Sequence, residues 1–402
     1  MRTIVFIGSN QFGTSNEALT VAKEMGYYIV LLTDKQKHDF FAVDKCIYTN
    51  HLMDFEKSID AISMLKEQGH EICACLSFID PYISYSAKLA KHFNLKEVSI
   101  DALIAMENKI TFREKLKDLS SSPFFTILHD DEPVDLFIEM HSSSLPLIIK
   151  PPALNGSKDI FLVETANQMS NAIHLIQQKH PKHPLLVEEY LVGPQYLIEV
   201  LTHNNELNII GIVAQEFSED DRFIVIGYQF PALLSEEEHQ SLIASVRDIT
   251  SQLGLLNGSC HLEMRNVNGK WKLIEINPRM SGGVMNRIIN EGTGINLIKE
   301  IIKLHLGEEP SLNQTKMYHV YARYLTINTR GKLLKVIGKE IALQHENVKD
   351  VYIKPLEGRI MTAPFSMGHR YASIIAASTS PEEAKSSALA AAMEIKFYLE
   401  PF

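Results

Sequence analysis

The most informative segment of this 402-residue chain is residues 261–283, which read HLEMRNVNGKWKLIEINPRMSGG. Two runs rich in strand-forming residues flank Asn268-Gly269, a pair that favours a tight hairpin turn. Glu263 and Glu275 are therefore expected on neighbouring antiparallel strands, and Asn277 shares the face of Glu275 because side chains alternate along a strand. Carboxylate and amide oxygens on one face suit Mg²⁺, which fills its remaining positions with water and phosphate oxygens. The segment predicts a magnesium site for nucleotide phosphates.

A simpler interpretation of these strands is a solvated face on which Glu275 pairs with a lysine such as Lys272. Apolar Ile274 and Ile276 flank Glu275, however, and a turn full of polar donors follows it directly. These neighbours favour a binding site.

The turn after the second strand carries groups that suit an anion. Arg279 is a planar cation that fits a carboxylate, or the tetrahedral anion formed when an amine attacks an acyl phosphate. Ser281, Gly282 and Gly283 leave backbone N–H groups open to a small anionic substrate. The competing interpretations are a surface arginine and a flexible loop.

Two upstream segments carry further candidates. Lys150 follows three apolar residues at the end of a predicted strand, where a lysine is rare unless its ammonium meets an anion. The loop Asn155-Gly-Ser-Lys158 follows, with N–H groups and the Ser157 hydroxyl able to cover phosphates. Further along, Glu188-Glu189-Tyr-Leu191 runs into Val192-Gly193-Pro194, a hinge whose backbone groups could read an adenine edge.

The first hundred residues alternate strand and helix patterns. Apolar runs at 2–7, 28–32 and 72–76 are separated by stretches with helical spacing. Such βαβ units imply a parallel, doubly wound sheet over residues 1 to about 105. Gly8 and Gly13 mark the first turn, but their spacing fits neither the Rossmann nor the Walker pattern. We expect a plain turn, although its helix N-terminus could receive a substrate carboxylate.

The remaining regions predict two smaller modules. Strands expected at 147–150, 160–163 and 185–189 form a small α+β module with the character of a lid. Near the C-terminus we expect strands at 318–325 and 370–377, followed by an alanine-rich helix over 383–399.

Taken in order, these motifs resemble the ATP-grasp superfamily of carboxylate–amine ligases, typified by biotin carboxylase and D-alanine:D-alanine ligase. The resemblance rests on Lys109, on Lys150 with its Asn-Gly-Ser loop, on Glu188-Glu-Tyr-Leu-x-Gly, and on Glu263 spaced twelve residues from Glu275-Ile-Asn-Pro-Arg. It covers nearly the whole chain. The sequences Gly368-His-Arg-Tyr and Thr379-Ser-Pro-Glu-Glu-Ala resemble the closing domain of the carboxylase-like branch.

The resemblance implies an ATP-grasp fold of mixed α/β and α+β class in four parts. These are an N-terminal doubly wound pre-ATP-grasp domain (1–107), a mobile central lid subdomain (108–190), a core that carries the metal and substrate sites (191–310), and a small C-terminal closing subdomain (311–402).

The resemblance also assigns roles by position, beginning with ATP and Mg²⁺ as cofactors. Two metal ions, with Mn²⁺ as a substitute, would be bridged by Glu263 and Glu275 and completed by Asn277. Arg279 would hold the acyl phosphate and the following tetrahedral intermediate, so Arg279 and Lys150 are the catalytic candidates.

Nucleotide contacts follow in the same way. Lys109, Lys150 and Ser157 would contact the ATP phosphates. Glu188 would accept from the adenine amino group, and the backbone of Glu189 and Leu191 would complete adenine recognition. Gln195 stands where many members place a carboxylate on the ribose hydroxyls.

Within the superfamily, Asn277-Pro-Arg-Met-Ser-Gly-Gly followed by a helix resembles the L-amino-acid ligases, which make dipeptides from unprotected amino acids. This implies an ADP-forming ligase that activates one amino acid as an acyl phosphate and joins it to the amine of a second. Substrate candidates are Arg279, Ser281, Gly282 and Gly283 for the first carboxylate, Glu216 for its α-amino group, Met285 and Arg287 for the second amino acid, and His261 beside the metal strand.

Alternatives remain at each level. Glu216 could be a surface residue, Met285 could serve helix packing, and His261 could fill space. The enzyme could act on another carboxylate or on a carrier-bound substrate. A non-catalytic nucleotide-binding regulator is a third class, against which the intact set of candidate phosphate and metal ligands counts.

Composition limits the remaining function classes. With 49 acidic and 39 basic residues, the formal net charge of -10 argues against nucleic acid or an anionic membrane as the main partner. Four cysteines without paired spacing predict neither a disulfide framework nor a zinc site. No apolar run approaches the roughly 20 residues that span a bilayer, and the N-terminus does not fit a signal peptide. We expect a cytoplasmic enzyme of small-molecule amino-acid substrates, with a homodimer as its candidate assembly.

Overall fold

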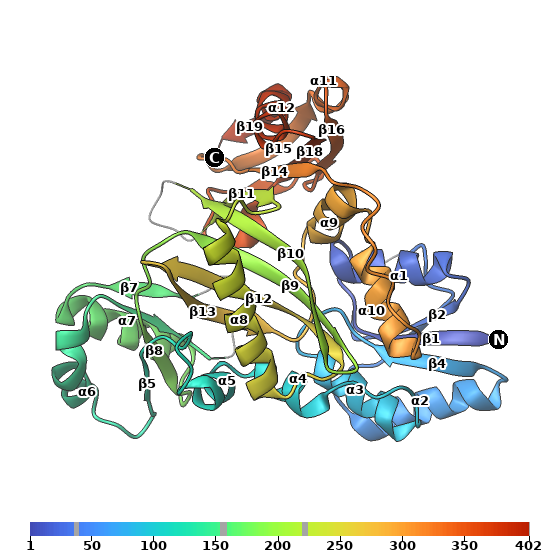
Figure 1. The fold of residues 1–402 in the computed structure, drawn as a ribbon, viewed down its shortest axis with the longest axis horizontal. Coiled ribbons are helices and arrows are strands. Elements are labelled where there is room, and N and C mark those ends of the chain that lie inside the picture. The colour runs from blue at the N-terminus through green and yellow to red at the C-terminus, as the bar shows by residue number, and fades with distance from the viewer. Residues whose placement is uncertain (36–39, 153–158, 219–223, 402) are drawn as a thin grey trace.

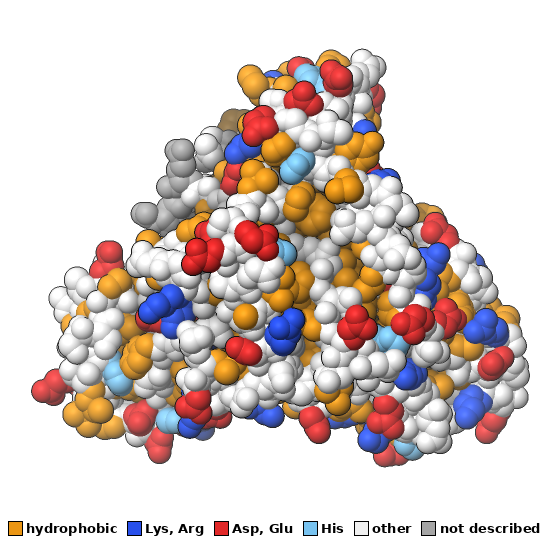
Figure 2. Space-filling view, viewed as in Figure 1, with side chains coloured by type: hydrophobic (Ala, Val, Ile, Leu, Met, Phe, Trp, Pro, Cys, Tyr) orange, Lys and Arg blue, Asp and Glu red, His pale blue; other side chains and the backbone are white. Residues whose placement is uncertain are grey.

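The computed structural model describes residues 1–35, 40–152, 159–218 and 224–401. A central sheet is surrounded by an N-terminal region, a small lid-like region and a C-terminal region (Figure 1). Acidic and basic side chains are interspersed over the face shown in Figure 2. Within the described ranges, no helix is both long and apolar enough to cross a membrane.

The N-terminal region is built on a parallel sheet ordered β3-β2-β1-β4, as the alternating pattern predicted. The central strand β1 is buried on both faces, because Ile4 and Phe6 pack with α1 while Val5 and Ile7 pack with α2 and α3. The strands are β1 (Arg2–Ile7), β2 (Tyr28–Thr33), β3 (Lys45–Tyr48) and β4 (Glu71–Leu76). The helices are α1 (Thr14–Glu24), α2 (Phe55–Glu67), α3 (Ile83–His92), α4 (Ile100–Glu107) and α5 (Lys109–Leu116).

The lid-like region is a four-stranded antiparallel sheet ordered β5-β8-β6-β7, with two helices. Its own apolar cluster includes Ile149 and Val187 from the sheet and Ile173 from α7, so the region has a separate small core. Thr165 and Gln168 form a capping box that starts α7. The elements are β5 (Phe125–Leu128), α6 (Val134–His141), the 3₁₀ turn η1 (Ser142–Ser144), β6 (Leu147–Lys150), β7 (Phe161–Val163), α7 (Ala166–Lys179) and β8 (Leu185–Glu189).

The central sheet has eight strands in the order β13-β12-β9-β10-β11-β14-β18-β16, and all its pairs are antiparallel. Helices α8, α9 and α10 bury apolar residues in the large core that this sheet shares with the N-terminal region. The elements are β9 (Gln195–His203), β10 (Glu206–Phe217), β11 (Val225–Phe230), α8 (Glu236–Leu253), β12 (Gly258–Val267), β13 (Lys270–Asn277), α9 (Met285–Thr293), α10 (Leu297–Leu306) and β14 (His319–Leu325).

The C-terminal region continues the central sheet and adds a three-stranded sheet ordered β17-β15-β19. Its elements are β15 (Gly331–Ile337), α11 (Lys339–Gln344), β16 (Val348–Ile353), β17 (Ile360–Met361), the 3₁₀ turn η2 (Met367–His369), β18 (Ala372–Ser378), α12 (Pro381–Glu394) and β19 (Lys396–Pro401).

The helix predicted over 383–399 is too long at its C-terminal end. Helix α12 stops at Glu394, and the following residues form strand β19 along β15. Phe397 and Leu399 pack against the buried Leu333, so apolar residues recur with the period of a strand. The pairing partner lies about sixty residues earlier in the chain, out of reach of a local pattern.

Candidate active site

A cavity of about 690 Å³ lies where the central sheet, the lid-like sheet, the first N-terminal turn and the C-terminal region meet. The structure brings most of the predicted site residues to its wall. These are Lys109, Lys150, Glu188, Glu189, Leu191, Gln195, His261, Glu263, Glu275, Asn277, Arg279, Ser281, Gly282 and Gly283.

Two carboxylates face each other on the hairpin, since Glu263 and Glu275 are direct register partners. Burial and the neighbouring charge of Glu275 raise the pKa of Glu263 above its usual range. For Glu275 burial acts in the same direction, but Lys109 and Lys150 outweigh it and hold that pKa low. The Lys109 ammonium lies 3.1 Å from Glu275 Oε1. The pair therefore concentrates negative charge that a divalent cation would neutralise.

The ligand set fits Mg²⁺ rather than a metal held by protein alone. Asn277 Nδ2 lies 3.3 Å from Glu275 Oε1, so the amide shares the face of the carboxylates. Within the described residues, no group of three or more His, Cys, Asp or Glu is placed to hold a metal. Two carboxylates and an amide leave the remaining positions to phosphate oxygens and water, as Mg²⁺ bound to a nucleotide requires.

A buried charge cluster underlies the lid side of the cavity. Lys150 Nζ lies 2.5 Å from Glu188 Oε2, and Arg113 Nε donates to Glu188 Oε1. Burial lowers the pKa of Lys150. Burial alone would raise the pKa of Glu188, but Arg113 and Lys150 hold it low. Both Glu188 carboxylate oxygens are thus engaged, so the predicted adenine contact would have to use another atom of this residue.

Arg113 was not among the sequence candidates. It also donates from Nη2 to the Ile274 carbonyl at 2.7 Å, which links α5 to the β12–β13 hairpin. Its position four residues after Lys109 places both cations on one face of α5. The four-residue spacing from Lys109 could therefore have identified Arg113 from the sequence.

Gln195 belongs to a second network of hydrogen-bonded polar groups. Its Nε2 donates to Glu263 Oε2 at 3.1 Å, and its Oε1 accepts from Arg265 Nε at 3.0 Å. Arg265 in turn donates to the Leu191 carbonyl. Both ends of the Gln195 amide are therefore occupied by protein groups, and its predicted ribose contact stays a prediction. Arg265, two residues after Glu263 on the same strand face, was also missed.

The turn at 277–283 is anchored to the N-terminal region and to the sheet beneath it. Arg279 donates from Nε and Nη2 to Asp80 Oδ2 at 2.9 and 2.5 Å. Ser281 donates from its backbone N to Glu199 Oε1 at 2.9 Å and also from its hydroxyl. Asp80 follows the end of β4, and Glu199 is an isolated acid within an apolar strand. Neither was found from the sequence, because each acts through a residue far away in the chain.

His261 stabilises the same turn as a neutral group. Burial and then the Arg279 charge lower its pKa to about 4. Its Nδ1 donates to the Arg279 carbonyl at 2.8 Å. Gly283 adopts φ +74°, and a Cβ there would lie 3.2 Å from Tyr324 Oη. The positive φ therefore favours glycine at this position, and a Cβ would also press on the Tyr324 hydroxyl.

Two family models match separate parts of the chain. An ATP-grasp domain model matches residues 143–287, and the model for L-amino acid ligase C-terminal domain 2 matches residues 323–400. The chain thus contains an ATP-grasp domain over residues 143–287. The ATP-grasp match covers strands β6, β7 and β8 of the lid-like sheet and the β12–β13 hairpin, and the second match covers most of the C-terminal region, so the predicted fold and resemblance are confirmed.

Individual relatives agree with the family models. The solved L-amino acid ligase of Bacillus licheniformis has the same fold, with a TM-score of 0.84 at 20% identity over 100% of this chain and 99% of that one. The uncharacterized protein y4rH of Sinorhizobium fredii is 24% identical over 81% of this chain and 69% of its own length. Dapdiamide A synthase of Enterobacter agglomerans is 24% identical over 54% of this chain and 53% of its own length.

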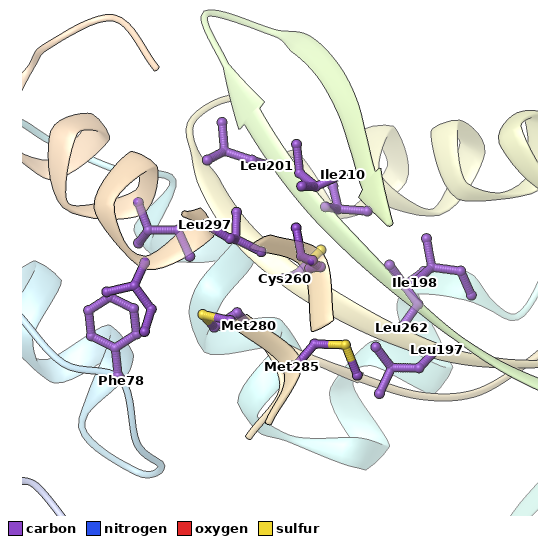
Figure 3. Close-up of a cluster of buried hydrophobic side chains, with 14 of the residues drawn as sticks. Phe78, Leu197, Ile198, Leu201, Ile210, Cys260, Leu262, Met280, Met285 and Leu297 are labelled. Atoms are coloured by element: carbon purple, nitrogen blue, oxygen red, sulfur yellow. The ribbon is translucent and has the colours of Figure 1, made fainter. Parts of the chain in front are cut away.

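Three predicted substrate residues lie outside the cavity wall. Glu216 accepts from Tyr321 Oη at 2.5 Å and pairs with Lys385, so it joins the central sheet to α12. Met285 is fully buried in the apolar cluster under the turn (Figure 3). Arg287 points to the surface, where it pairs with Asp350. Ser157 lies outside the described residues.

Met285 and Arg287 were misplaced for a common reason. Both follow the glycine turn closely in sequence, but α9 turns its apolar face into the core and its polar face outward. Proximity in sequence to the site therefore did not place either side chain in it. Glu216 was misplaced because strand β10 aims it at the C-terminal region.

Proposed function

We propose that this ATP-grasp protein is an ADP-forming ligase that activates the carboxylate of one amino acid as an acyl phosphate and joins it to the amine of a second, giving a dipeptide. The observation that carries the proposal is the opposed Glu263–Glu275 pair, which shares one cavity with buried Lys109 and Lys150 and with Arg279. That arrangement combines a site for metal-bound phosphates with a cation for a carboxylate.

Glu263, Glu275 and Asn277 would hold Mg²⁺, and the unfavourable pairing of the two carboxylates supports this assignment. When bound, the metal supplies positive charge that offsets the charge developing on the transferred phosphoryl group. ATP enters as a substrate. Lys109 and Lys150 bind its phosphates, and the 188–191 segment lines the adenine end.

The chain's own groups then orient the reacting carboxylate. An oxygen of the donor carboxylate attacks the γ-phosphorus, and the bond from that phosphorus to the ADP oxygen breaks. Arg279, aligned by Asp80, holds the resulting acyl phosphate, and the Ser281–Gly283 turn presents N–H groups. The acceptor amine attacks the acyl carbon, the bond from that carbon to the phosphate oxygen breaks, and the proton lost by the amine passes to the departing inorganic phosphate. The lid-like region, proposed to close over ATP, excludes water that would hydrolyse the acyl phosphate.

The relatives support amino acids as substrates. One solved structure with this fold is an L-amino acid ligase, a curated relative is a dapdiamide synthase, and the C-terminal region matches a domain model of L-amino acid ligases. The second candidate, a ligase for another carboxylate or a carrier-bound substrate, shares the ATP chemistry and differs only in the occupant of the cavity.

The test measures ADP formation and product mass with ATP, Mg²⁺ and the twenty L-amino acids, singly and in pairs. Hydroxylamine in parallel reactions captures any acyl phosphate as a hydroxamate. ADP that requires two amino acids, together with a dipeptide mass, supports the proposal. Hydroxamate formed only from other carboxylates would favour the second candidate and refute the first. The variant Glu275→Gln, which lacks a candidate metal ligand, should lose ADP formation. Glu206→Gln changes an exposed glutamate at the start of β10 and is the matched control.

A further inference from the structure

The C-terminal region contributes one cation to the cavity, Arg370, which the functional assignment above does not use. The other lining lysines and arginines that the structure describes have partners. Lys109, Arg113, Lys150 and Arg279 each pair with a carboxylate, and Arg265 donates to Gln195 and to the Leu191 carbonyl. No carboxylate within the described residues forms an ion pair with Arg370, so its charge is available to an anion in the cavity.

Neighbouring groups hold the Arg370 guanidinium in place without neutralising it. Its Cζ lies 3.9 Å from the centre of the Tyr324 ring and 5.9 Å from that of Tyr228. Its Nε donates to the Met367 carbonyl at 3.3 Å. Its Nη1 is buried and has no hydrogen-bond partner in the described structure. An arginine that is fixed by aromatic rings, with one guanidinium nitrogen lacking an acceptor among the described residues, is preorganised for a planar anion.

Arg370 also lies beside the glycine turn that the donor carboxylate is proposed to approach. A Cβ built on Gly283 would come within 3.8 Å of Arg370 Nη2. This is an ordinary van der Waals distance, so the guanidinium lies directly beside the glycine turn. Gly282 and Met367 line the adjoining wall, so the space beside Arg370 belongs to the same cavity.

We propose that Arg370 binds the α-carboxylate of the acceptor amino acid and thereby selects amino acids over simple amines. This inference rests on the proposed function. A reacting pair of amino acids has two carboxylates, and the donor's is consumed as the acyl phosphate forms. The acceptor's carboxylate stays anionic through the reaction and into the product, so it needs a lasting cation. Arg279 is already balanced by Asp80, whereas Arg370 is not.

The size of the effect follows from the strength of such a pair. A charge-assisted hydrogen bond to a desolvated carboxylate corresponds to roughly 10- to 100-fold in kcat/KM. Replacing the acceptor amino acid by its amide removes this interaction from the substrate side. Arg370→Gln removes it from the protein side, and the two changes together should cost little more than either alone.

The experiment compares an acceptor, for example L-alanine, with L-alaninamide as substrates of the wild-type protein, Arg370→Gln and Arg370→Lys. In the wild type, kcat/KM should favour the acid by roughly 10-fold or more, and this preference should fall to within about threefold in Arg370→Gln. Arg370→Lys should recover part of it. Arg359→Gln, an exposed arginine of the same region, is the matched control and should keep the wild-type preference.

Two results would overturn the inference. An unchanged acid-to-amide preference in Arg370→Gln would show that the arginine does not meet the acceptor carboxylate. Loss of hydroxamate formation with a raised KM for ATP would instead place Arg370 on the phosphates. Hydroxamate captured from the donor amino acid alone reports the first step, so failure of the ligase proposal itself would appear as absence of hydroxamate in the wild type.

Discussion

Replacing Glu199 by Gln should remove a pH dependence from the stability of the protein. Glu199 is fully buried beneath the turn at 277–283, where Oε1 accepts two hydrogen bonds from Ser281 and Oε2 has no partner among the described residues. Burial raises its pKa from 4.5 to about 7, against the effect of the Ser281 hydrogen bonds. The folded protein thus holds this proton more tightly than the unfolded chain. The resulting stabilisation is complete below about pH 4.5 and is lost as the pH rises through about 7.

The magnitude follows from the two pKa values. Their difference of about 2.5 corresponds to about 3 kcal/mol in total, of which about 2 kcal/mol is lost between pH 5.5 and pH 8.0. The neutral amide of Glu199→Gln keeps an acceptor for Ser281 and does not titrate. The free energy of unfolding of the wild type, minus that of the variant, should therefore fall by about 2 kcal/mol between these pH values.

Urea unfolding at the two pH values measures this difference, because titrations common to both proteins cancel. Glu206→Gln on the exposed start of β10 is the control, and it should change stability by less than about 0.5 kcal/mol at either pH. A wild-type minus Glu199→Gln difference that stays constant from pH 5.5 to pH 8.0 would refute the reasoning. It would mean that Glu199 is already ionised in the folded protein at pH 5.5.

Three further predictions concern the site and its surroundings. Glu275→Gln should lower ATP turnover by about 100-fold or more while the urea transition stays cooperative, and wild-type ADP formation would contradict the metal assignment. Met285→Ala should lower the free energy of unfolding by about 2 to 5 kcal/mol, because the side chain is fully buried; a loss under about 1 kcal/mol would show that the cluster in Figure 3 tolerates a cavity. Arg287→Ala breaks an exposed pair with Asp350, so stability should change by less than about 1 kcal/mol and the range of acceptor amino acids should stay the same, which the pairwise substrate matrix would check.

Much of the fold could be predicted because its signals are local. Apolar alternation, the Asn268-Gly269 turn and the strand–helix repeats of the first hundred residues depend on neighbours in sequence, and each matches an observed element. The period of two along a strand also predicts that Glu275 and Asn277 share a face. Glu263 opposes Glu275 only because the register shifts between Glu263 and Met264, and the two-residue turn alone would have paired Glu263 with Ile274. The end of α12 could not, because β19 exists only through its pairing with β15.

The amino-acid sequence by itself determined the presence of a hairpin with a carboxylate on each strand, the buried lysines and the glycine turn, since local spacing sets where strands and turns fall. The direct opposition of Glu263 and Glu275 depends on a shift in the strand register. Only the tertiary structure decided how these groups are balanced. The partners come from distant parts of the chain: Asp80 pairs with Arg279, Arg113 pairs with Glu188, and Glu199 accepts from Ser281. Arg370 likewise reaches the cavity wall from the C-terminal region. Charge pairing and burial depend on distances in space, which no local spacing encodes, and the same packing moved Glu216, Met285 and Arg287 away from the site.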